Sequence, residues 1–162
     1  MVYGVPLTGV ERVLSVIPNV SFSRGFLGLK TRSCSLVLTD RRVLVARFTM
    51  AQGKALGREA RDHAKADGKG RMGQLAAQSH VWDTVASTYR SMPLEQILAE
   101  NPDNIAVDRA SITNVKVAHK KGSDTTVASD TLVIETSGKK YKFTFMGSMR
   151  QAREALATAG LN

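Results

Sequence analysis

The chain has 162 residues, of which 43% are hydrophobic, and it carries a formal net charge of +9 at pH 7. This length is typical of one domain with a sizeable core, and the composition is that of a globular protein. No apolar run in the sequence approaches the roughly 18 residues that a membrane-spanning helix needs, which argues against that class of protein.

The first predicted strand covers residues 10–17, where aliphatic side chains fall on both faces of an extended chain. Pro18 has no amide hydrogen to donate, so we expect strand pairing to end there. Residues 19–32 mix glycines with apolar and basic side chains. They are predicted to form a loop or an irregular hairpin in which Phe22 is exposed.

A β-hairpin is predicted next, with strands near residues 33–39 and 42–48. Two aliphatic runs flank the polar segment Thr39-Asp40-Arg41-Arg42. We expect Asp40 to accept hydrogen bonds from the amides that follow it, because this interaction favours a tight reversal of the chain.

Residues 51–92 are rich in good helix formers, and we expect a break in the helix near Gly68 and Gly70. After the break, apolar residues recur at steps of three and four, which predicts one helical stripe. Its members are Met72, Leu75, Ala76, Ser79, Trp82, Val85, Ala86 and Tyr89. A short second helix is predicted over residues 93–100, since proline is allowed at the start of a helix.

Strand signals return at residues 105–107, 112–117, 131–135 and 140–145, and the last two are predicted to form a second hairpin. In residues 140–145 aromatic side chains alternate with polar ones, which is typical of a strand with one buried face.

The chain closes with a predicted amphipathic helix that begins at Ser148. Ser148 and Gln151 have the spacing of a capping box, and Gly160 is expected to stop the helix.

The order of these elements resembles the pleckstrin-homology (PH) superfold, in particular bacterial PH-like and GRAM-like domains. The resemblance is carried by LVLTDRRVLV at residues 36–45, by IAVDRASITNVKV at residues 105–117, and by the final hairpin with its helix. It implies an α+β fold in which about seven antiparallel strands form a partly open barrel capped by a C-terminal helix. Residues 50–103 would then be a helical insertion between strands 3 and 4 of a single domain.

Residues with catalytic or metal-binding potential do not form a recognisable pattern. His63, His80 and His119 lie far apart, without the spacing of a metal site. Cys34 lies in a predicted strand, where cysteine is usually a small core residue. We therefore expect a protein that is not an enzyme and that uses no cofactor and no metal.

The single cysteine also bears on the compartment. One cysteine allows no disulfide within the chain, which fits a reducing interior. We expect a cytoplasmic protein, with a position at the membrane periphery as the alternative.

Two sets of residues are candidate binding sites, and the first follows from the resemblance. PH domains that hold inositol phosphates use a basic-x-Arg pattern at the first hairpin, and Lys30-Thr31-Arg32 resembles its end, with Arg24 or Arg12 as a partner. Phe26 and Leu27 would then enter a lipid headgroup layer. The alternative, which is favoured, is that Phe22, Phe26, Leu27 and Leu29 cover the barrel or a neighbouring subunit.

The second set lies in the predicted insertion. The stripe containing Trp82 and Tyr89 could cover the barrel, pair with another copy or lie on a membrane. Packing within the chain or self-association is favoured, because an apolar helix stripe is more often buried than lipid-facing. The first half of the insertion could meet an anionic surface or form a solvated face; its cations are Lys54, Arg58, Arg61, Lys65, Lys69 and Arg71.

The leading prediction is a non-enzymatic interaction module that binds protein partners or anionic lipid surfaces. One alternative is a nucleic-acid-binding protein, because the net charge of +9 attracts phosphates. Against it, aromatic residues are only 6% of the chain and mostly occupy predicted core positions. The other alternative is a self-associating structural domain without a small ligand.

Overall fold

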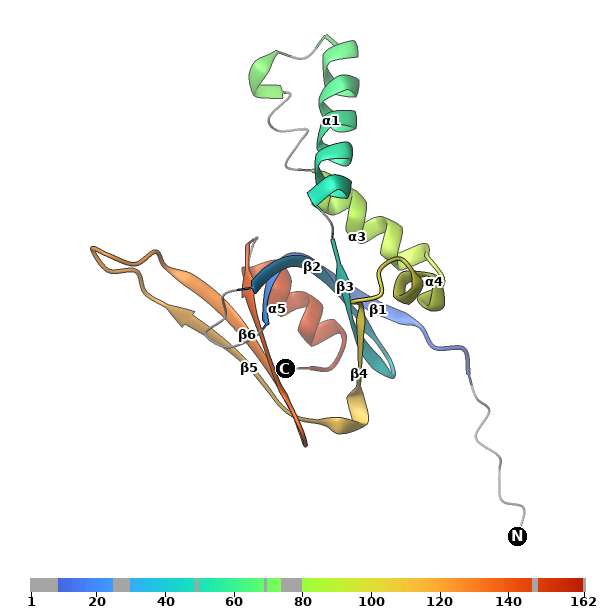
Figure 1. Ribbon diagram of the computed structural model, residues 1–162, viewed down its shortest axis with the longest axis vertical. Coiled ribbons are helices and arrows are strands. Elements are labelled where there is room, and N and C mark those ends of the chain that lie inside the picture. The colour runs from blue at the N-terminus through green and yellow to red at the C-terminus, as the bar shows by residue number, and fades with distance from the viewer. Residues whose placement is uncertain are drawn as a thin grey trace.

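The computed structural model describes residues 9–24, 30–48, 50–68, 70–73, 80–146 and 149–161, and within these the side chains of all residues except 24, 30 and 50–52. The fold is α+β, with seven antiparallel strands in the order β4-β3-β2-β1-β7-β6-β5 (Figure 1). The outermost strands, β4 and β5, do not pair with each other within the described part of the chain, so the sheet is not closed.

The strands are β1 (Val13–Arg24), β2 (Lys30–Thr39), β3 (Arg42–Arg47), β4 (Ile105–Asp108), β5 (Ile112–Lys120), β6 (Ser129–Thr136) and β7 (Lys140–Phe145). The helices are α1 (Met50–Ala66), α3 (Val81–Ser91), α4 (Leu94–Ala99) and α5 (Met149–Thr158). A 3₁₀ turn over Arg109–Ser111 joins β4 to β5.

The predicted hairpin of β2 and β3 is confirmed, but its turn is held by a different residue. The hydroxyl oxygen of Thr39 accepts hydrogen bonds from the amides of Arg41 and Arg42, at 3.1 and 2.7 Å. Asp40 instead accepts one from the amide of Arg12 at 3.0 Å. The buried threonine therefore shapes the reversal, while Asp40 ties the N-terminal segment to it.

The prediction that pairing ends at Pro18 is wrong, because β1 continues to Arg24. A shift in the pairing register with β2 places Pro18 and Asn19 in a bulge, and Asn19 has a φ of 55°. Proline is tolerated in a bulge, where its missing amide hydrogen is not needed, and asparagine tolerates the left-handed region. Phe22 looks exposed from the local sequence, but it is buried and its ring stacks on Phe143 with centroids 5.1 Å apart, which agrees with the favoured interpretation that it covers the barrel.

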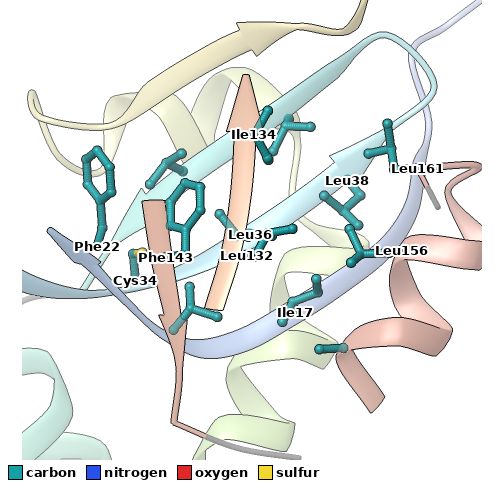
Figure 2. Packing of buried hydrophobic residues seen from close by; sticks show 14 of the residues in the cluster. Ile17, Phe22, Cys34, Leu36, Leu38, Leu132, Ile134, Phe143, Leu156 and Leu161 are labelled. Carbon is teal, nitrogen blue, oxygen red and sulfur yellow. The ribbon is translucent and has the colours of Figure 1, made fainter. Parts of the chain in front are cut away.

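Buried apolar residues form two clusters, one on each face of the sheet. The inner core is covered by α5 and contains Ile17, Val20, Phe22, Cys34, Leu36, Leu38, Val43, Val45, Val107, Leu132, Ile134, Phe143, Phe145, Ala152, Leu156, Ala159 and Leu161 (Figure 2). The outer core is covered by α3 and α4 and contains Val16, Val37, Leu44, Ala46, Val81, Val85, Ala86, Tyr89 and Ile97. Strands β2 and β3 contribute to both clusters, which explains why their apolar residues run without alternation.

Helices α1, α3 and α4 lie between β3 and β4 in the chain, where the sequence placed the helical insertion. The expected break is present, since α1 ends at Ala66 and Gly68 has a φ of 72°. The predicted stripe is buried at Val85, Ala86 and Tyr89, whereas Met72 is 79% exposed and does not belong to it. Leu75, Ala76 and Ser79 lie outside the described residues.

The C-terminal helix is confirmed as α5, which buries Ala152 and Leu156 and is followed by Gly160 with a φ of 67°. Ser148, its predicted cap, lies outside the described residues. No helix in the described stretches combines the length and the apolar character that crossing a bilayer requires.

Candidate functional site

A groove of about 950 Å³ lies between the ends of β2 and β3 on one side and α1 and α3 on the other. It forms where the chain leaves the sheet to enter α1, which projects away from the sheet (Figure 1). Its volume is in the range of small-molecule sites, roughly 300–1,000 Å³. Five cationic side chains line it, and we call it the basic groove: Arg32 of β2, Arg47 of β3, and Lys54, Arg58 and Arg61 of α1.

The basic groove holds a surplus of positive charge. Among the described residues that line it, Asp103 is the single carboxylate, and it binds the guanidinium of Arg47. Within the described residues, the other four cations form no ion pair. Their mutual repulsion is relieved by solvent or by a bound anion, so an anionic ligand is the natural complement of this groove.

Three of the cations share one face of a helix. Lys54, Arg58 and Arg61 are separated by four and then three residues, which places them on one face of α1. Arg32 is exposed on β2 and pairs with Phe22 of the inner core, so alternation along the strand directs its side chain to the other face of the sheet, at the edge of the groove. A ligand inside the groove therefore meets positive charge mainly from α1.

Arg47 anchors the floor of the basic groove. Its side chain is only 11% exposed, and its amide donates a hydrogen bond of 2.7 Å to the side chain of Asn104. The Nε of Arg47 is buried and has no hydrogen-bond partner among the described residues. Since Asp103 already neutralises Arg47, the net attraction for an anion comes from the other four cations, which form no ion pair with any described residue.

Two aromatic rings form the apolar part of the wall. Phe48 and Trp82 are both half-buried, and their ring centroids are 4.9 Å apart at an interplanar angle of 52°. Gly53 of α1 approaches Phe48 so closely that a Cβ atom there would lie 3.0 Å from the ring. This close approach positions the start of α1, and with it the cationic face, against the sheet.

The structure brings together residues from both predicted sets. Arg32, from the set suggested by the resemblance, shares the basic groove with Arg58 and Arg61 of the insertion. Arg24 and Lys30 pair with each other at the adjoining ends of β1 and β2, and their side chains lie outside the described part. Phe26, Leu27, Leu29 and Lys69 lie outside the described residues.

The two aromatic residues of the predicted stripe have different positions. Trp82 lines the basic groove, whereas Tyr89 is 5% exposed in the outer core. The hydroxyl of Tyr89 donates a hydrogen bond of 3.2 Å to Glu100, and burial raises the pKa of Tyr89, with the Glu100 charge adding to the shift. Tyr89 therefore packs within the chain, which is the intramolecular alternative for this stripe.

Sequence reasoning did not identify Arg47, Phe48, Asn101 or Asp103 as part of a site. These residues lie at the two ends of the segment between β3 and β4, and antiparallel pairing of those strands brings them together. The sequence carries one signal for this site. Arg47 directly follows a buried aliphatic run, and a charged residue in that position indicates that the strand leaves the core there.

The residues considered for catalysis do not line the basic groove. Cys34 is fully buried, and burial raises the pKa of its thiol to about 12, so it remains protonated at neutral pH. His63, His80 and His119 each face a single carboxylate. The described residues contain no group of three or more side chains suited to holding a metal ion.

Comparisons with protein-family models, with curated proteins and with solved structures found no match to this chain.

Proposed function

We propose that this protein is a non-enzymatic interaction module with a PH/GRAM-like barrel, and that it binds an anionic partner in the basic groove. The observation that carries the proposal is the row of three cations on one face of α1, Lys54, Arg58 and Arg61, which form no ion pair with any described residue and line the groove. The PH-like assignment is supported by the seven antiparallel strands, by the C-terminal helix and by the order of the sequence motifs. A cytoplasmic position is supported by the single, buried cysteine.

The shape of the site favours a discrete partner over a flat lipid surface. A bilayer meets cations that protrude from a protein, whereas the cations here line a groove. A narrow anionic segment that enters the groove can contact several cations of α1 at once. The role of Phe26 and Leu27 at a headgroup layer stays a prediction.

The proposal is tested by measuring binding of three anionic probes to the full chain: polyglutamate, an oligonucleotide and vesicles that contain an anionic phospholipid. Arg58→Glu combined with Arg61→Glu should weaken binding of at least one probe by about tenfold or more, because two attractive charges become repulsive.

A matched control is Lys120→Glu with Lys121→Glu, which changes the net charge equally at an exposed turn far from the groove in the chain. This control should bind as the wild type does. An equal loss in both variants would show that only net charge matters, and failure of every probe to bind would also refute the proposal.

A further inference from the structure

The residues that line the basic groove indicate which class of anion it binds. This inference rests on the proposed function. We propose that the basic groove binds single-stranded nucleic acid. Its unpaired cations hold backbone phosphates, and the exposed part of the Phe48–Trp82 pair receives a base. Low aromatic content argued against nucleic acid at the level of composition, but the position of these two rings matters more than their number.

The spacing of the cations suits a ligand with repeated charges. A rise of about 1.5 Å per residue places Lys54 and Arg61 about 10 Å apart along α1, with Arg58 between them. One phosphate or carboxylate cannot contact all three side chains at once. A chain that carries a charge on each unit can do so, and each contact releases a condensed counterion.

The aromatic wall distinguishes a nucleic acid from an acidic peptide. Phe22, Phe143, Phe145 and Tyr89 are buried in the two cores, so they are not available to a ligand. Of the described aromatic residues, Phe48, Trp82 and Tyr141 are half-buried, and Phe48 and Trp82 line the groove beside the cations. An acidic peptide gains little from such a surface, whereas every base has a π face that stacks on it.

The groove favours a single strand over a duplex. Phe48 and Trp82 pack on one another within the groove wall and do not protrude from the molecule as a wedge. A duplex keeps its bases stacked and directs them inward, so they do not reach a recessed ring without unpairing. An unpaired strand can turn a base toward the ring while its phosphates face the cations.

Trp82 is the only tryptophan in the chain, so its fluorescence reports directly on the proposed contact. The full chain is titrated with an oligothymidylate dodecamer and with an abasic dodecamer of the same phosphate number. The normal oligomer should quench Trp82 and bind roughly tenfold more tightly, since stacking contributes only when a base is present. A plot of log K against log salt should have a slope of about −2 for three phosphate contacts.

Two variants separate the contributions of charge and stacking. Arg58→Gln with Arg61→Gln should make the salt slope shallower by about 1.4, because two phosphate contacts are lost. Trp82→Leu, followed by anisotropy of a labelled strand, should weaken the normal oligomer roughly tenfold and leave the abasic one unchanged. Lys120→Gln with Lys121→Gln is the control and should alter neither quantity.

The outcomes distinguish this inference from the proposed function. Equal binding of the abasic and normal strands, tighter binding of a duplex, or equally tight binding of polyglutamate at the same charge would each overturn the single-strand inference. The proposed function would survive those results if Arg58→Gln with Arg61→Gln still weakened the favoured probe. If that variant weakened no probe, both proposals would be refuted.

Discussion

At the scale of single residues, Arg42 joins three segments that are distant in the sequence. Its guanidinium donates hydrogen bonds to both carboxylate oxygens of Glu11 at 2.8–3.1 Å and reaches Glu95 of α4 at 3.2 Å. The Glu11 and Arg42 side chains are 13% and 25% exposed, so solvent screens their contact only in part. Hydrogen bonds from Arg42 therefore lower the pKa of Glu11 below its ordinary value of 4.5.

Glu11→Gln should lower the free energy of unfolding at pH 7 by about 1–3 kcal/mol, because Arg42 loses a charged partner. The folded-state pKa of Glu11 lies below the unfolded value near 4.5, so the contribution is fully present above that pH. It is lost as the pH falls through the folded-state pKa. Urea unfolding of the wild type and of Glu11→Gln across this pH range should show that the difference in stability disappears in acid.

The control for this prediction is Glu154→Gln, which removes a surface pair with Arg150 whose two side chains are 88% and 63% exposed. Such a pair contributes about 0–1 kcal/mol, so the stability of the control should differ little from that of the wild type, both at pH 7 and in acid. A deficit of Glu11→Gln that stayed constant down to pH 3 would mean that the charge of Glu11 is not the cause.

At the scale of elements, the placement of α1 depends on one close approach. An added Cβ at Gly53 would lie 3.0 Å from the Phe48 ring, whereas one at Gly57 in the same helix would meet nothing within 4 Å. Both glycines lower the stability of the helix relative to alanine. Comparing the two Gly→Ala substitutions therefore separates the effect of helix propensity from the effect of packing.

Gly57→Ala should raise the free energy of unfolding by about 0.5–1 kcal/mol, the intrinsic preference of alanine for a helix. Gly53→Ala should gain less than this or destabilise the protein, because the Phe48 ring must move to admit the methyl group. Urea unfolding followed by Trp82 emission is a suitable measurement, since Trp82 packs on Phe48. Equal effects of the two substitutions would contradict the contact between α1 and the ring.

The elements that sequence reasoning located well are those specified by local pattern. The hairpin of β2 and β3, the alternating strand β7 and the amphipathic helix α5 each bury a face that their own residues define. The first predicted strand ended too early, at residue 17. That prediction considered only the missing amide hydrogen of Pro18. Pairing with β2 continues on both sides of the bulge, and this long-range interaction overrides the local one.

The candidate site was only partly predictable, for the same reason. Arg32 and the cations of α1 were identified as basic residues, but nothing in the local sequence shows that they line one groove. Asp103 enters the groove because β3 and β4 pair, and this contact joins residues more than fifty positions apart. Trp82 was assigned to an apolar stripe, and the sequence alone does not show that one side of its ring meets the groove.

At the scale of the whole molecule, the insertion between β3 and β4 is a structural part of the sheet's outer face. Its helices supply half of the outer core and cover Val37, Leu44 and their neighbours, which are almost fully buried. The pairing of Val45 with Ile105 brings the chain ends that flank the insertion to adjacent strands. A short loop could therefore replace residues 50–103 without breaking the pairing of β3 with β4.

Replacing residues 50–103 with Asn-Gly should produce a chain that aggregates and binds a hydrophobic dye, because the outer face of the sheet is uncovered. Adding Val37→Thr and Leu44→Thr to the shortened chain should reduce both effects, since threonine keeps a strand preference and makes that face polar. The same two substitutions in the full chain should cost several kcal/mol, because they place hydroxyl groups in a packed core. Light scattering measures aggregation, dye fluorescence measures exposed apolar surface, and urea unfolding measures stability.

The decisive result is that Val37→Thr with Leu44→Thr improves the shortened chain but destabilises the full chain. A shortened chain that stayed monomeric, and that the threonines did not improve, would show that the segment does not shield the sheet.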